Sequence, residues 1–518
     1  METLNEKTEI SVKSDSTGLF ARVAVFALLT GIPLFMTDKY FNITLSKFLY
    51  FACLSTFGFL LCQLFKPEKS LRMKNTANRT TDICIAGFVV SGLISTVFSD
   101  YFTEALLGSA GRCMGFLYLL ILAALYYMVS RYYKVREMDM IAYFAVFLIV
   151  LFIAFLQFFG VNVFYLYDNV TQKTVDNYYS MIGNINVVSS YICLCVPFIM
   201  YAFCFTTRLY KRISLFILCF IGFCFLVISN SDSGYLGIAA AFWMLGIFLT
   251  RKRKYFHKLL FLFSAFLFST KFVYLLSKTF ETKKLSSLAV LLGESDIILG
   301  LAIGILVLGV LLINIRISKK SMTFIRILFI ALPVVLFAVL IGAIVYFTVF
   351  NPQAELGDLE NYLRFNDRWA TGRGRIWRVT MEAFADMPFI KKLIGCGPDT
   401  LVLLFEDFLP ESEIISFGVV DNAHNEFMNY LVNHGIIGLV FYIGIVASAL
   451  RNCYLKRENG MLYRGLFLVV FTYVCQSVVN ISQPLTTPYF FLLVFISCSD
   501  YVKNDKKAVF VEAEGQKT

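Results

Sequence analysis

Long apolar segments recur along nearly the whole sequence, and they constrain the fold more than any other feature. A helix needs about 20 apolar residues to cross a bilayer core, and about 14 segments approach that length. The predicted spans cover residues 19–37, 44–65, 81–98, 114–130, 140–160, 187–206, 212–229, 234–250, 258–276, 297–314, 324–350, 427–450, 462–480 and 485–500. Lys271 interrupts the ninth segment, and Glu294 and Asp296 precede the tenth. We therefore expect an all-α, polytopic integral membrane protein with about 12–14 transmembrane helices.

The charge distribution supports a membrane fold and argues against a nucleic-acid partner. Only 16% of the residues are charged and 58% are hydrophobic, whereas soluble proteins average roughly 25% charged residues. The net charge of +11 resides in short clusters between the apolar segments. Such clusters are typical of topology signals that contact membrane lipids, rather than of a basic groove for nucleic acid.

Lysine and arginine are concentrated in every second connection, which predicts that both termini are cytoplasmic. Basic clusters of this kind occupy residues 66–79, 131–136, 208–212, 251–258, 316–326 and 451–464, and the C-terminal tail adds Lys503, Lys506 and Lys507. We expect a cytoplasmic tail (1–18), a transmembrane region of about 11 helices (19–350), one large extracytoplasmic loop (351–426), about 3 further helices (427–500) and a cytoplasmic tail (501–518).

Cysteine and histidine usage does not favour a metal site. Most of the 13 cysteines lie inside apolar segments, no Cys-x-x-Cys pair occurs, and the chain has 3 histidines. A disulfide scaffold or a structural zinc site is therefore not expected. We expect no metal and no cofactor.

The long loop contains an unusually dense cluster of basic residues. Arg368, Arg373, Arg375 and Arg378 fall in one short stretch on the predicted extracytoplasmic side, where base is usually sparse. Arginine binds phosphate oxygens in bidentate fashion, and a helix predicted over 376–386 would place an anion-favouring N-terminus nearby. Two interpretations remain open: a site for a lipid phosphate or pyrophosphate, or an interfacial patch on anionic head groups.

The second candidate, Asp421-Asn422-Ala423-His424-Asn425-Glu426, lies where the loop meets the next span. Histidine accepts a proton near neutral pH, and the neighbouring carboxylates could orient it. His434 lies inside the span, and we interpret it as structural. Gly435 and Gly438 predict close packing against another helix.

Three weaker features face the same compartment by this topology. Arg112 precedes the fourth span, Asn186 opens the sixth, and residues 229–234 form a polar turn between the seventh and eighth. Each could be an ordinary interfacial turn. Polar and basic groups that share one bilayer surface indicate a cavity that opens there.

Together these motifs resemble the O-antigen ligase and polymerase superfamily of bacterial membrane glycosyltransferases. The resemblance rests on His424-Asn425 followed by Gly435 and Gly438, and on the loop motif Gly372-Arg373-Gly374-Arg375-Ile376-Trp377 with Leu393-Ile394-Gly395-Cys396-Gly397-Pro398-Asp399. Arg112 with Gly115, Gly183 with Asn186, and Gln157 match earlier landmarks. One departure is Asp232, because many relatives have an arginine in that turn. The resemblance therefore does not extend an anion-binding role to this turn.

The resemblance implies a glycosyltransferase C-like fold and a metal-independent, inverting reaction. A glycan would pass from undecaprenyl pyrophosphate to an acceptor hydroxyl of a glycan, lipid or wall group, at the outer face of the bacterial cytoplasmic membrane. It implies that His424, Arg373 and Arg375 are catalytic. It also implies that the substrate-binding residues are Arg112, Asn186, Arg368, Asn425 and Glu426.

Three alternatives to a single assignment remain at this point. Polymerase and ligase use the same donor, so the sequence does not separate them. A lipid-linked oligosaccharide flippase can also have about 14 spans, but it needs a charged central cavity, whereas the candidates here cluster on one face. A scaffold that joins other polysaccharide-assembly membrane proteins is the third.

Overall fold

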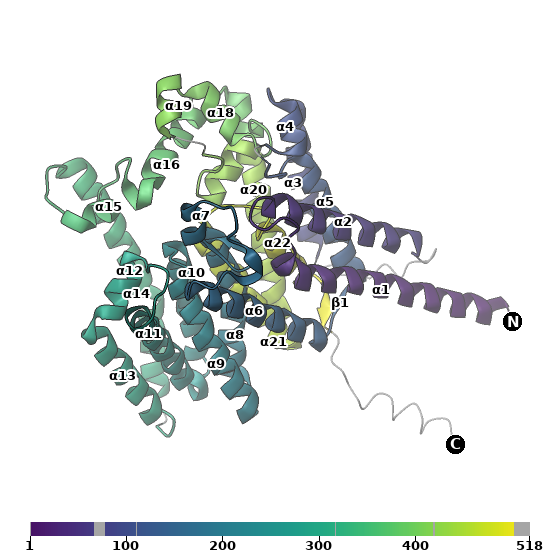
Figure 1. Ribbon diagram of the computed structural model, residues 1–518. Coiled ribbons are helices and arrows are strands. Elements are labelled where there is room, and N and C mark those ends of the chain that lie inside the picture. The colour runs from purple at the N-terminus through teal and green to yellow at the C-terminus, as the bar shows by residue number, and fades with distance from the viewer. Residues whose placement is uncertain (1, 67–77, 110, 316, 418–419, 502–518) are drawn as a thin grey trace, which may run out of the picture.

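Helices make up most of the computed structural model, which describes residues 2–66, 78–109, 111–315, 317–417 and 420–501 (Figure 1). The strands are two residues long. β1 (Lys134–Val135) pairs in parallel with β4 (Asp500–Tyr501), and β2 (Tyr178–Tyr179) pairs antiparallel with β3 (Gly183–Asn184). The basic residues of 67–77 and, beyond its first residue, the predicted tail 501–518 lie outside the described residues. The predicted all-α polytopic class is confirmed.

Within the described residues, ten helices are long and apolar enough to cross a membrane, or eleven if α12 and α13 form one bent span. The ten are α1 (Glu2–Leu34), α2 (Ile43–Leu64), α3 (Arg79–Val97), α6 (Glu137–Phe158), α8 (Ile185–Phe205), α9 (Leu209–Ile228), α10 (Asp232–Thr250), α11 (Phe256–Thr279), α14 (Lys319–Val345, continued by a π-helical turn, Tyr346–Phe350) and α20 (Glu426–Leu455). Shorter apolar helices occupy the other predicted spans: α5 (Phe116–Tyr132), α21 (Met461–Ser477) and α22 (Thr487–Ile496). The N-terminal residues expected to form a tail continue α1 as helix.

The ninth and tenth predicted spans differ in continuity. α11 is continuous through Lys271, whose Nζ lies 2.9 Å from Asp296 Oδ1, so its charge is paired. The tenth span is preceded by α12 (Ser287–Glu294), which meets α13 (Asp296–Leu311) at 64°. Ser295 ends one helix and caps the other by accepting a hydrogen bond from the N–H of Ile298. A capping serine followed by aspartate starts a new helix there.

Burial separates an interior helix from a peripheral one. The most hydrophobic 18 residues of α8 are entirely buried, against α9, α10 and α21. The corresponding residues of α14 are 0% buried, and α14 packs mainly on α10. Both helices are apolar all round, which a bilayer allows because a lipid-facing surface needs no protein cover.

Residues 351–426, the loop segment, form a small folded layer at one end of the bundle (Figure 1). The segment holds α15 (Glu360–Leu363), α16 (Trp369–Asp386), α17 (Phe389–Ile394), α18 (Leu401–Phe408) and α19 (Glu411–Phe417). The predicted helix over 376–386 is thus confirmed, with an earlier start. Val379, Leu401 and Phe405 form an apolar core of this layer together with Val432 of α20. The layer is therefore joined to the span that follows it.

Candidate functional site

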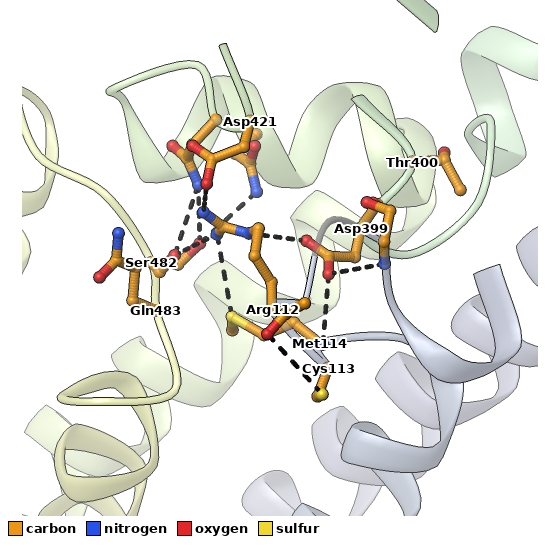
Figure 2. A network of polar contacts seen from close by, with 12 residues as sticks. Arg112, Cys113, Met114, Asp399, Thr400, Asp421, Ser482 and Gln483 are labelled. Atoms are coloured by element: carbon orange, nitrogen blue, oxygen red, sulfur yellow. Dashed lines mark hydrogen bonds and ion pairs between the residues drawn. The ribbon is translucent and has the colours of Figure 1, made fainter. Parts of the chain in front are cut away.

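Arg112 lies at the centre of a buried polar network between α4 (Phe102–Leu107) and α5 (Figure 2). Its Nε donates to Asp399 Oδ1 at 3.0 Å, its Nη1 donates to Asp421 Oδ2 at 3.0 Å, and its Nη2 donates to the carbonyl of Ser482. The Arg112 side chain is only 4% exposed. One guanidinium thus joins the α4–α5 turn, the loop segment and the connection after α21.

Asp399 completes this network from the loop segment. Its Oδ2 accepts hydrogen bonds from the N–H groups of Ser109 and Met114, both at 3.2 Å. Its other oxygen accepts from Arg112. A buried pair with its hydrogen bonds filled holds its geometry, and removing one partner costs about 3–5 kcal/mol. The loop motif that ends at Asp399 therefore anchors the loop segment on the α4–α5 turn.

Two carboxylates neutralise Arg112. Burial lowers the pKa of its guanidinium, but the charges and hydrogen bonds of Asp421 and Asp399 outweigh burial and raise the pKa above its ordinary value. With Nε, Nη1 and Nη2 all engaged, the group has little capacity left for a substrate anion. The arrangement favours a positioning role for Arg112 over the direct substrate contact that the resemblance implies.

The loop motif also docks on α20, at a break in that helix. Gly435 has φ 68°, so α20 is interrupted there. The carbonyls of Val432 and Asn433 accept hydrogen bonds from the N–H groups of Cys396 and Gly397, at 3.0 and 3.1 Å. A Cβ at Gly435 would lie 2.2 Å from the carbonyl oxygen of Leu393, so only glycine fits. The expected close packing is present at both glycines: Gly435 packs on the end of α17 and the loop backbone after it, and a Cβ at Gly438 would lie 3.2 Å from Ser91 Oγ of α3.

His424 sits just before α20, with its backbone at φ 49°. Its N–H donates to Asn422 Oδ1 at 3.0 Å, which fixes the turn. The imidazole Nδ1 is buried and makes no hydrogen bond to the described residues. Burial, with the positive charges of Arg373 and Arg112, lowers the pKa of His424 to about 4, although Asp421 opposes this. The imidazole is therefore neutral near pH 7 and can accept a proton.

Arg373 lies at the start of α16, and its charge acts on His424. Residues Ala370, Thr371 and Gly372 have positive φ, so the chain turns before the regular helix begins. Arg373 Nη1 donates to the carbonyl of Ala370 at 2.9 Å and to Thr371 Oγ1 at 3.0 Å, while Nε is buried without a partner in the described chain. Burial lowers the pKa of Arg373, and the charge of Asp232 partly offsets this. Unlike Arg112, it keeps donors for an anion.

The other three arginines of the predicted cluster lie in surroundings that differ from those of Arg373. Arg375 Nη2 lies 3.7 Å from Glu413 Oε2, and Arg378 pairs with Asp367 and Glu382. Arg368 is exposed at the N-cap of α16. The structure thus separates the four arginines that the sequence grouped, because successive helical residues point about 100° apart.

Asn425 and Glu426, which the resemblance implies to be substrate-binding, both make contacts within the protein. Asn425 Oδ1 accepts hydrogen bonds from the N–H groups of Phe427 and Met428, at 3.0 and 3.1 Å, so it caps α20. Glu426 is fully buried, beside the hydroxyl groups of Tyr442 and Tyr473. Both side chains thus support the start of α20, and their contact with substrate stays a prediction.

Asn186 belongs to a buried network of neutral side chains. Its Oδ1 accepts from Ser231 Oγ at 3.1 Å, and Gln476 Nε2 donates to Ser233 Oγ at 3.1 Å. Asn480 Nδ2 donates to Ser190 Oγ at 2.8 Å. None of the predicted site residues lies on α21 or on the connection after it, although Gln476 within an apolar span is a recognisable signal of a polar contact. The network ties Asn186 to the turn before α10.

Comparison with known proteins gives one family. Residues 284–443 match the family model described as O-antigen ligase. The matched range includes Arg373, the loop motif and His424, whereas Arg112 and Asn186 lie outside it. No curated protein matches the chain.

Proposed function

Since residues 284–443 place this chain in the O-antigen ligase superfamily, we propose that it transfers a glycan from undecaprenyl pyrophosphate to an acceptor hydroxyl. The family match supports a polysaccharide ligase or polymerase role, and the helices support a multi-pass bacterial membrane protein. We propose that both termini are cytoplasmic and that the loop segment lies on the extracytoplasmic face, because the basic connections alternate with it.

One observation carries the proposal: the charge of Arg373, whose buried Nε is unfilled, acts on the buried imidazole of His424. Transfer to a hydroxyl needs a group that accepts a proton and a group that stabilises the leaving anion. His424, just before α20, supplies the proton acceptor, and Arg373, at the start of α16, supplies the stabilising charge. Arg112 positions the surface between them through Asp399 and Asp421.

The proposed transfer is a displacement at the anomeric carbon of the donor glycan. The acceptor oxygen forms a bond to the anomeric carbon from the face opposite the leaving group, while its proton passes to His424. The bond from that carbon to the pyrophosphate oxygen breaks, and its electron pair stays on undecaprenyl pyrophosphate. Arg373 stabilises the charge that develops there. The configuration at the anomeric carbon inverts, and the proton then leaves His424 for solvent.

The acceptor decides between polymerase and ligase. An acceptor that is itself a lipid-linked unit makes the reaction a polymerisation, and a terminal lipid, wall or protein group makes it a ligation. Arg368 and Arg375 lie outside the immediate pair and contribute positive charge around the donor. The transfer that we propose requires no metal ion.

Product analysis on purified protein tests the proposal. The protein is reconstituted in nanodiscs with polyprenyl-pyrophosphate-linked glycan extracted from cells that lack it, with and without EDTA. We expect longer glycan and free undecaprenyl pyrophosphate, unaffected by EDTA. A protein that moved the lipid-linked glycan across vesicles without forming a glycosidic bond would be a flippase, and the proposal would fail.

A further inference from the structure

An open groove lies between α9 and α13, at the edge of the helical bundle (Figure 1). Both helices pack on α11, which forms the floor of the groove. Phe216 and Phe220 line it from α9, and Leu299 and Leu306 line it from α13. The volume of the groove is about 550 Å³. The proposed transfer gives this groove no role.

The lining of the groove is apolar and bulky. Phenylalanine provides five of the 11 lining residues, and the rings of Phe220 and Phe272 meet across α9 and α11 with their centroids 5.7 Å apart. Ser264 is one of two polar lining residues, and its hydroxyl donates to the carbonyl of Ala302 at 2.8 Å. Helices that pack closely in a membrane do so through small residues. These phenylalanine walls therefore suit a thin hydrocarbon chain rather than another helix.

Lys271, the second polar lining residue, places a charge at the end of the groove where α13 begins. Its Nζ lies 2.9 Å from Asp296 Oδ1 and donates to the carbonyl of Glu294 at 3.3 Å. The Lys271 side chain is only 16% exposed, whereas the Asp296 side chain is 91% exposed. The apolar groove thus ends at a cation on the inside and a carboxylate on the outside.

The position of this ion pair fits the dimensions of one membrane leaflet. α13 has 16 residues and is therefore about 24 Å long, so its first residue, Asp296, lies near one surface of a bilayer core of about 30 Å. Phe261 and Lys271 both line the groove from α11, and they lie about 15 Å apart along the helix axis. The apolar part of the groove therefore has the length of one leaflet, with the pair at the level of the head groups.

We propose that this groove binds a phospholipid with a zwitterionic, amine-bearing head group, of the phosphatidylethanolamine class. One acyl chain lies along the phenylalanines. A lysine ammonium has three donors, of which Asp296 and Glu294 use two, so the third is left for the lipid phosphate. The head-group ammonium pairs with the exposed carboxylate of Asp296. The same carboxylate repels a head group that carries only negative charge. The site does not depend on the proposed transfer.

Photo-crosslinking tests the occupancy of the groove without turnover. The probe is a phosphatidylethanolamine with a diazirine on one acyl chain, added to the purified full-length protein in detergent micelles. We expect crosslinks on the peptides of α9, α11 and α13 that line the groove. Leu306→Trp adds bulk to the α13 wall and should remove most of this crosslink. Leu308→Trp is the matched control, because Leu308 is 47% exposed on the same helix but does not line the groove, and it should keep the wild-type yield.

Competition by unlabelled lipids tests the head group. Phosphatidylethanolamine should compete with the probe about 2- to 5-fold more strongly than phosphatidylglycerol with the same acyl chains, as for a partly exposed ion pair. Asp296→Asn should remove this preference. Asp100→Asn removes an exposed carboxylate that pairs with Lys391 elsewhere on the molecule, and it should keep the preference.

Three results would overturn the proposal. Crosslinks that avoid the groove peptides, or that Leu306→Trp leaves unchanged, would show that this lipid does not occupy the groove. Competition by undecaprenyl phosphate, but by neither phospholipid, would assign the groove to a polyprenyl chain. Equal competition by the two phospholipids, in the wild type and in Asp296→Asn alike, would exclude recognition of the amine by Asp296.

Discussion

Arg112 and Arg373 occupy the same end of the bundle, yet their surroundings are opposite. Arg112 is bound by Asp399, Asp421 and a backbone carbonyl. Among the described residues, Arg373 bonds only to its own turn and keeps a buried, unfilled Nε. In the sequence both are arginines beside glycines. This end of the bundle therefore uses one arginine to hold the loop segment in place and leaves another with donors for an anion.

The largest expected effect is on stability, at Arg112. Arg112→Ala leaves Asp399 buried without its cation, so the free energy of unfolding should fall by about 3–5 kcal/mol. Thermal unfolding in nanodiscs measures this. The added substitution Asp399→Asn should restore part of the loss, because it removes the uncompensated charge. An unchanged unfolding temperature for Arg112→Ala would contradict the structural role of Arg112.

The next effect is on catalysis, at His424. His424→Gln removes the proton acceptor, and the transfer rate should fall about 10²- to 10⁴-fold with a normal unfolding temperature. His257→Gln, in the first turn of α11, is the matched control and should transfer normally. Near-normal transfer by His424→Gln would exclude it as the base.

The pH dependence follows from the environment of His424. A base must be neutral to act, and a lowered pKa keeps it neutral at lower pH. With the pKa at about 4, kcat/KM should not lose activity through His424 until the pH approaches 4, because this ratio reports the free enzyme. Rates measured at several pH values, with stability checked at each, test this. A histidine-dependent acid limb near the ordinary pKa of about 6.5 would contradict the burial of the imidazole.

The smallest effect is expected at Arg375. Its contact with Glu413 at 3.7 Å is partly exposed, and such pairs contribute about 0–1 kcal/mol. Arg375→Gln should therefore keep the unfolding temperature close to that of the wild type, and its transfer rate should stay within a few-fold. A loss as large as that of an Arg373 variant would return Arg375 to the catalytic group.

The bundle was predictable because each span depends on local hydrophobicity. The break in α20 at Gly435 was not predictable, because it accommodates the backbone of Gly395 in the loop segment. The partners of Arg112 were equally hidden, because Ser482 lies some 370 residues away. His424 and Arg373 could be chosen by residue chemistry. Asn425 could have been read as an N-cap from its place before a helix, whereas the pairing of Arg375 with Glu413 needed the fold.

The transfer rate of Arg373→Ala tests the central claim most directly, compared with that of Arg378→Ala in parallel preparations. Both residues lie on α16, but Arg378 is exposed and paired with Asp367. Removing a group that stabilises developing charge costs about 10²- to 10³-fold. The account predicts a loss of that size for Arg373→Ala, at an unchanged unfolding temperature, and a nearly normal rate for Arg378→Ala. Equal, near-normal rates for both variants would contradict it.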